Sequence, residues 1–156
     1  MKFRLVSDDE INQVRNMDGT ADVIRRKAKD LVATLGNEFN NADPGGIRGV
    51  QFTYVESPRV IGKVQTRIGA GRLRLTWKHD GNELLGEVVV DREIFDQQDR
   101  QCWDPVYSFL LAEQGRWRPT TQGGNVPNYL NGDSDLRNWA LGASIFYAIL
   151  KGPVTA

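Results

Sequence analysis

The sequence predicts an α+β domain in which an antiparallel β-meander of four to five strands has helices before and after it that pack on the sheet. Strand-like segments follow one another in the middle of the chain and are joined by short turns that contain glycine. Helical periodicity comes before these segments, and an apolar helix comes after them. The expected order is β-α-α-β-β-β-β-α-α, and 156 residues fit one domain over 1–156.

The first elements are a short strand at 2–6 and a helix. Ser7 is a good helix cap, and Glu10, three residues later, completes the capping-box pattern. We expect this helix to run to about Met17 and to end at Asp18-Gly19, because glycine disfavours the helix interior.

A second helix is expected from Thr20, with apolar residues at helical spacing as far as Gly36, which is a natural terminator. The Asn-, Asp-, Pro- and Gly-rich stretch 37–46 is typical of a loop. The meander follows this loop. Its four strands are expected at 47–56, 59–68, 71–79 and 82–91.

Two tight turns set the expected register of the meander. Asp80-Gly81 is a strong two-residue hairpin signal, and Gly69-Ala70 suits a turn with glycine first. The Gly69-Ala70 turn places Arg67 opposite Arg72. The Asp80-Gly81 turn predicts the pairs Lys78–Glu83, Arg74–Glu87, Trp77–Leu84 and Leu73–Val88.

The expected core joins the inner face of the sheet to residues of the flanking helices. We expect truncation of Trp77 or Phe146 to be costly, since both are large core residues in this arrangement. The core residues are expected to be Leu31, Leu35, Val60, Val64, Leu73, Leu75, Trp77, Leu84, Val88, Val90, Phe146 and Ile149.

The last third of the chain is expected to be helical at both ends. Asp104 followed by Pro105 is typical of a helix start, and this helix would end near Gly115. A long irregular stretch at 116–133 follows. The closing helix, from Asp133 or Ser134 to Gly152, is apolar on nearly every side, so it belongs in the core or in a homodimer interface.

Composition excludes several kinds of site. Lys plus Arg and Asp plus Glu are both 20, so the net charge is zero, although 44–79 is mainly basic and 80–113 mainly acidic. The only cysteine, Cys102, and the only histidine, His79, exclude a disulfide framework, a Cys-pair zinc site and a two-histidine site within one chain. We expect no cofactor, and neither residue is expected to be catalytic, because His79 adjoins a hairpin tip and Cys102 has no second histidine to activate it.

The chain shows no signal peptide and no membrane span. The N-terminal apolar stretch is too short, and the most apolar segment, 136–150, is interrupted by polar residues. Together with the unpaired cysteine, this predicts a soluble cytoplasmic protein without a membrane partner.

The candidate binding surface consists of closely spaced arginines with aromatic residues beside them. Arg67, Arg72 and Arg74 would repel one another unless an anion or a carboxylate lay among them. Strand parity is expected to place Phe52 and Tyr54 on the same face, and Trp117 of the 116–133 loop could fold over it. The alternative is that a carboxylate from 96–104 satisfies the arginines and a helix covers the rings.

Three functions remain open at this point. The leading one is a non-catalytic interaction or regulatory module that binds a protein partner through this sheet face or the 116–133 loop. The second is a small metal-dependent hydrolase or nuclease that uses Asp91 and Glu93, because carboxylates two residues apart on a strand point the same way and can share a magnesium ion. The third is a single-stranded nucleic-acid binder, because cations beside stacking rings on a sheet bind such strands.

Overall fold

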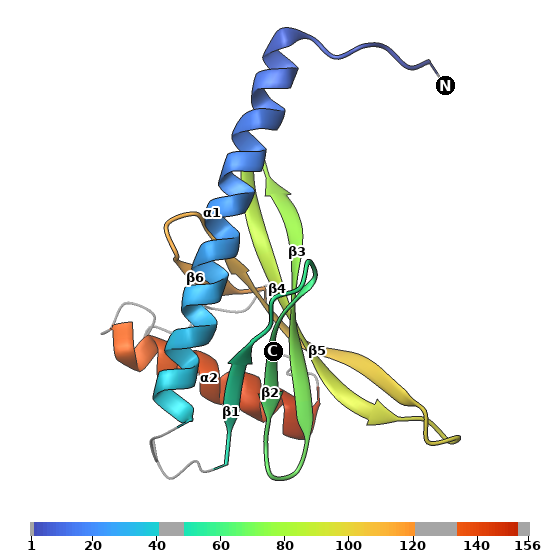
Figure 1. Cartoon of the computed structure of the whole chain (residues 1–156), viewed down its shortest axis with the longest axis vertical. Helices are drawn as coiled ribbons and strands as arrows, with labels where there is room; N and C mark the ends of the chain where they lie inside the picture. The colour runs from blue at the N-terminus through green and yellow to red at the C-terminus, as the bar shows by residue number, and fades with distance from the viewer. Residues whose placement is uncertain (1, 41–48, 121–133, 153–156) are drawn as a thin grey trace.

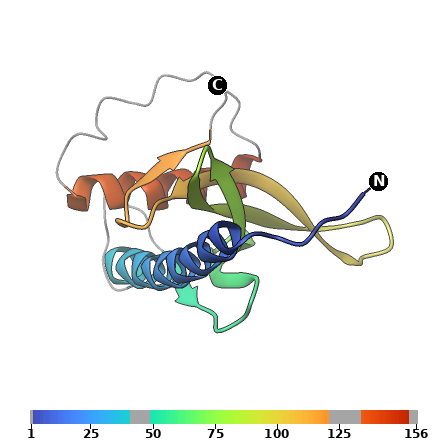
Figure 2. The same ribbon diagram turned by 90° about the horizontal axis from the view of Figure 1, so that it is seen from above.

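The computed structural model describes residues 2–40, 49–120 and 134–152 and confirms the α+β class. A long helix is followed by a curled six-stranded antiparallel sheet and a second helix (Figures 1 and 2). The strands lie in the sheet in chain order, so the sheet is a meander. The elements are α1 (Asp8–Phe39), β1 (Gln51–Tyr54), β2 (Val60–Gln65), β3 (Ala70–Asp80), β4 (Glu83–Phe95), β5 (Gln101–Leu111), β6 (Trp117–Pro119) and α2 (Ser134–Lys151).

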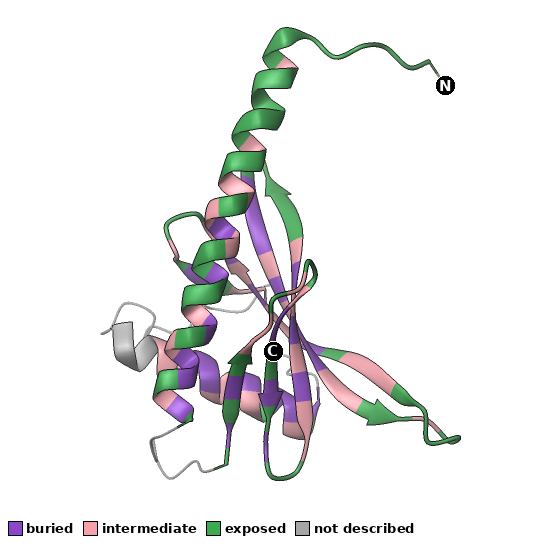
Figure 3. Cartoon of the chain, in the orientation of Figure 1, coloured by how far each residue is buried: buried purple, intermediate pink, exposed green. Residues whose placement is uncertain are grey.

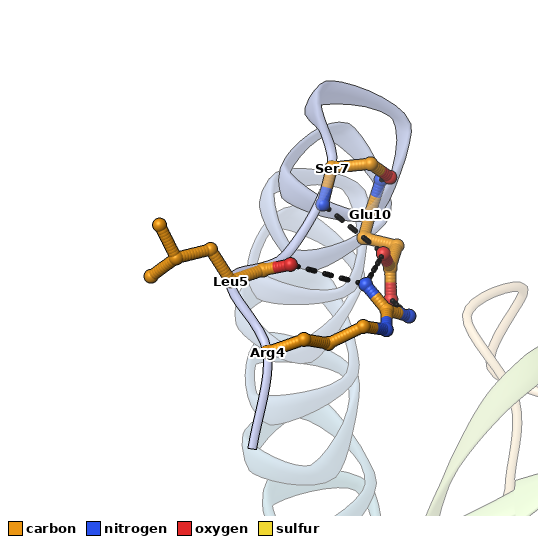
Figure 4. Close-up of polar contacts among 4 residues, drawn as sticks. All are labelled: Arg4, Leu5, Ser7 and Glu10. Carbon is orange, nitrogen blue, oxygen red and sulfur yellow. Dashed lines mark hydrogen bonds and ion pairs between the residues drawn. The ribbon is translucent and has the colours of Figure 1, made fainter. Parts of the chain in front are cut away.

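Helix α1 begins at the predicted capping box. The backbone N–H of Glu10 donates to the Ser7 hydroxyl, and the Glu10 carboxylate accepts from the backbone N–H of Ser7 (Figure 4). The predicted end at Asp18-Gly19 is wrong, because α1 is one helix of 32 residues. A single exposed glycine costs only about 1 kcal/mol relative to alanine, and the apolar face keeps its helical phase across Gly19.

The strand predicted at 2–6 is not observed. These residues are extended but have no strand partner in the part of the chain that the structure describes. The segment lies beyond the sheet, before the projecting first turns of α1, and is exposed throughout (Figure 3).

The hairpin between β3 and β4 is where the sequence places it, but its register is shifted by two residues. Asp80 pairs with Glu83, and Lys78 pairs with Leu85. The loop is therefore Gly81-Asn82, with Gly81 at φ +62° in the first position. This turn requires a positive φ at the glycine alone, whereas the predicted type I′ turn would also require one at Asp80. The predicted residue pairs are therefore wrong. The face of the sheet predicted for each of these residues is right, because a shift of two residues keeps every side chain on the same face.

The hairpin between β2 and β3 also differs from the expected one. Lys63, not Arg67, pairs with Arg72, and Gln65 pairs with Ala70. The connection is the four-residue turn 66–69, in which the Thr66 hydroxyl donates to the carbonyl of Gly69 at 2.6 Å. The expected opposition of Arg67 and Arg72 is therefore wrong.

The helix predicted after Asp104 is strand β5 instead. Its apolar residues alternate, and Tyr107, Phe109 and Leu111 point to the core side while the residues between them point away. Pro105 is tolerated because it lies beside a register shift, where Val90 pairs with Tyr107 and the next residue of β4 pairs with Pro105. The predicted irregular stretch begins with the short strand β6, and residues 121–133 lie outside the described residues.

Both helices pack on one face of the sheet. A Cβ added to Gly86 would lie 2.7 Å from the side chain of Ile24 in α1, and one added to Gly71 would lie 2.6 Å from the side chain of Ile149 in α2. Gly71 and Gly86 are on the same face by strand register. The core of this layer includes Ile24, Leu35, Phe52, Val64, Leu73, Leu75, Val88, Val90, Phe109, Leu111, Leu141 and Ile145.

Two residues of the predicted core differ from the expectation. Val60 pairs with Arg74 and lines the hollow of the uncovered face, so its expected place on the inner face is wrong. Trp77 is on the helix-covered face but is 38 % exposed, and it lies on the part of β3 beyond the last pair with β2, so its expected full burial is wrong. Helix α2, as predicted, places apolar residues in the core.

No helix of the described residues is long and apolar enough to cross a membrane.

Candidate functional site

The centre of the uncovered sheet face is a buried carboxylate held by two arginines. Asp91 of β4 is 1 % exposed. Arg72, directly opposite on β3, donates from Nε to Asp91 Oδ2 at 2.8 Å, and Arg74 donates from Nη2 to Oδ1 at 2.9 Å. A second bond joins Arg74 Nε to Oδ2. The anion that the closely spaced arginines require is therefore part of the chain, but it is Asp91 and not a residue of 96–104.

The electrostatics of this cluster favour the charged carboxylate. Burial acts to raise the pKa of Asp91, but the hydrogen bonds from Arg74 and Arg72 outweigh it and hold the pKa below its ordinary value. The hydrogen bonds that Arg74 donates to Asp91 also raise the pKa of Arg74. The cluster is an internal ion triad of two guanidiniums and one carboxylate, so it keeps a net charge of +1.

Beside the triad lies a hollow in the uncovered face. The guanidinium of Arg72 lies 4.3 Å from the centre of the Trp103 ring, which comes from β5. This pair lines a hollow of about 400 Å³ between the β2–β3 hairpin and the β4–β5 hairpin. We call it the sheet hollow. Its polar and aromatic lining comprises Lys63, Gln65, Arg72, Glu93, Gln101 and Trp103.

One wall of the sheet hollow carries an unneutralised acid, and a strand edge adjoins it. Glu93 accepts a hydrogen bond from the Gln101 side chain at 2.6 Å, and no described cation pairs with it. The pairing of β3 with β4 stops at Arg92, so residues 93–95 of β4 pair only with β5 among the described residues. We call the other side of 93–95 the free β4 edge. Its backbone groups are available to an added strand.

Two predicted aromatic residues lie on the other face. Phe52 pairs with Val64 on the helix-covered side, is buried, and contacts the Phe39 ring at a centroid distance of 5.5 Å. Tyr54 is half-buried there, with Lys29 of α1 5.0 Å from its ring centre. The expectation that these rings share the face of the arginines is therefore wrong. Helix α1 covers them, as the alternative predicted.

The structure separates the remaining predicted residues. Arg67 is exposed in the β2–β3 turn and lies against Gly49, where an added Cβ would be 2.7 Å from its side chain. Trp117 is buried, with its ring edge-on to Phe109 at 6.1 Å. Of the six predicted binding residues, the structure brings together only Arg72 and Arg74.

Asp91 and Glu93, the two carboxylates predicted to share a metal ion, are engaged with other side chains in the structure. Asp91 and Glu93 do point to the same face, but the Asp91 carboxylate is already surrounded by two guanidiniums, which disfavour a further cation. Among the described residues, no three His, Cys, Asp or Glu side chains are grouped as metal ligands would be. His79 is exposed beside its hairpin tip, and Cys102 is half-buried.

The basic face expected for nucleic acid is also reduced. Arg72 and Arg74 share the single negative charge of Asp91, and Lys78 pairs with Glu87 at 2.8 Å. Phe52 and Tyr54, the rings expected to stack on bases, lie on the helix-covered side instead.

Sequence reasoning missed Trp103, because Asp104-Pro105 assigned its neighbourhood to a helix start. The alternation of Tyr107, Phe109 and Leu111 was the signal for a strand.

No family model, curated protein or solved structure matches this chain.

Proposed function

We propose that the protein is an interaction or regulatory module that binds an extended segment of a protein partner at the sheet hollow and the free β4 edge. The observation that carries the proposal is the position of a strand edge beside a hollow with an aromatic wall. An extended peptide gains main-chain hydrogen bonds from such an edge and specificity from a neighbouring pocket.

The chemistry of the lining supports a peptide over a small anion. Trp103 supplies a large apolar surface that is already oriented by Arg72, so little rotamer freedom is lost on binding. Glu93 favours a basic residue in the bound segment, and Lys63 on the opposite wall favours an acidic one. Trp and Arg are the residue types that dominate binding energy at interfaces.

Two further expectations belong to this proposal. The unpaired Cys102 agrees with a reducing compartment, so we expect the partner to be cytoplasmic. Helix α2 places Leu141, Ile145 and Ile149 in the core. Its Phe146 and Leu150 are only half-buried and its Tyr147 is 54 % exposed, so a homodimer through that helix stays a prediction beside the contact at the sheet hollow.

The test compares proteins captured from native extract by the wild type, Trp103→Ala and Tyr147→Ala. Tyr147 is a matched aromatic control, because it is exposed on α2, away from the sheet hollow. We expect a protein that the wild type and Tyr147→Ala retain and Trp103→Ala loses, with melting temperatures showing that all three fold. The same set of captured proteins with all three variants would contradict the proposal.

A further inference from the structure

The segment 2–6 has the properties of a strand without a sheet. Its residues alternate between basic and apolar at Lys2, Phe3, Arg4 and Leu5, and its backbone forms an open trace outside any helix or strand (Figure 1). Phe3 and Leu5 are 89 % and 94 % exposed. Exposure of this extent on neighbouring apolar residues is typical of a surface that binds another chain.

The segment is held in position rather than loosely attached. The Arg4 guanidinium donates to both Glu10 oxygens, at 2.8 and 3.0 Å, and to the carbonyl of Leu5 at 3.1 Å (Figure 4). The same Glu10 caps α1. The helix therefore presents the segment at a defined angle, and this lowers the entropic cost of binding it.

The fold contains a matching receptor at the free β4 edge. The β4–β5 hairpin projects from the sheet, with Phe95 62 % exposed and Ile94 38 % exposed (Figure 1). Glu93 is an acid without a cationic partner among the described residues, and Lys2 is a cation that forms no ion pair with them. Charge and apolar surface thus complement each other on the two segments.

The two segments cannot meet within one molecule. Met17 lies beside Asn82 and Leu84, near the start of β4. From there α1 runs about 14 Å back to its first residue, whereas β4 runs roughly 40 Å to its last residue. The segment 2–6 spans at most about 18 Å. Figure 1 shows the two at opposite ends of the molecule.

We propose that residues 2–6 of one copy add as a strand to the free β4 edge of a second copy, and that the exchange is reciprocal in a two-fold dimer. The proposal rests on the proposed function, because it names the segment that occupies the site. In a parallel addition, Lys2 lies opposite Glu93 and Phe3 lies opposite Ile94 on the other side of the strand. Two equal contacts then close the dimer without leaving either edge open.

Disulfide trapping tests the contact directly. In full-length chains that carry Cys102→Ser, the variants Phe3→Cys and Ile94→Cys are purified separately, mixed and oxidised. We expect a mixed cross-linked dimer, identified by mass spectrometry. The matched control mixes Phe3→Cys with Tyr147→Cys, an exposed position on α2, and should give no mixed product above background.

Sedimentation provides the second measurement. We expect the wild type to form dimers, Phe3→Ser to raise the dimer dissociation constant roughly tenfold or more, and Lys2→Glu or Glu93→Lys to weaken the dimer. The combined Lys2→Glu and Glu93→Lys variant should recover dimerisation, because both contacts are swapped together.

A monomeric wild type, or a dimer that gives no mixed product between Phe3→Cys and Ile94→Cys, overturns this inference. Loss of a captured protein on Trp103→Ala would then still support the proposed function with a different partner. The two failures are therefore distinguishable.

Discussion

Replacing Asp91 by Asn should destabilise the protein more than any other conservative change at a strand carboxylate. The substitution keeps the shape of the side chain but removes the charge that Arg72 and Arg74 share. Breaking a buried ion pair by removing one partner costs about 3–5 kcal/mol. The side chains of Arg72 and Arg74 are 27 % and 30 % exposed, so water can partly solvate them, and we expect about 3 kcal/mol.

The assay is urea denaturation at neutral pH, with Asp104→Asn as the matched control. Asp104 also faces an arginine across the sheet, at 3.2 Å from Arg92, but is 36 % exposed. Its loss should cost at most about 1 kcal/mol, as for other partly exposed pairs. The slope of the unfolding free energy against urea should not change, because the area exposed on unfolding is the same.

The pH dependence of stability gives the prediction a second readout. The pKa of Asp91 in the folded protein lies below its unfolded value of about 4. Its contribution to the unfolding free energy is therefore complete above that pH and is lost as the pH falls through the folded pKa. The stability difference between the wild type and Asp91→Asn should shrink over this acid range. Equal losses for Asp91→Asn and Asp104→Asn, or a difference that does not change with pH, would refute the reasoning.

Two further predictions concern the glycines and the start of α1. Gly71→Ala should lower stability by about 1–3 kcal/mol, because the new Cβ would lie 2.6 Å from the side chain of Ile149. Gly19→Ala should raise stability by up to about 1 kcal/mol, because no other atom lies near the new Cβ and alanine favours the helix. Thermal melts measure both, and shifts of the same sign would contradict the packing. The pKa of Glu10 is lowered to about 2 by hydrogen bonds from Arg4 and Ser7, so its capping contribution should persist down to that pH. Arg4→Met should raise the pKa of Glu10 toward its ordinary value in an NMR titration, and an unchanged pKa would show that the ion pair does not form.

Several local features of this protein could be predicted from the sequence alone. The capping box of Ser7 and Glu10, the hairpin at Gly81 and the apolar closing helix each depend on residues that are near in sequence, so a short window contains the information. The alternating segments also sufficed for a meander with flanking helices, because helix and strand periods differ clearly.

The candidate site depended on contacts that no local pattern specifies. Asp91 lies opposite Arg72 only because the β3–β4 register is two residues away from the predicted one, and both registers keep the same sheet faces. A register shift between Val60 and Gly62 places Val60 opposite Arg74 and Ile61 in the core, so simple alternation does not assign the faces of β2. Trp103 lines the sheet hollow because its segment is strand β5 and not a helix. The burial of alternate residues in β5 outweighed the helix-start preference of Asp104-Pro105. Pairing partners, bulges and covered faces are decided by the burial of the whole core, and for this reason only the tertiary structure determined the site.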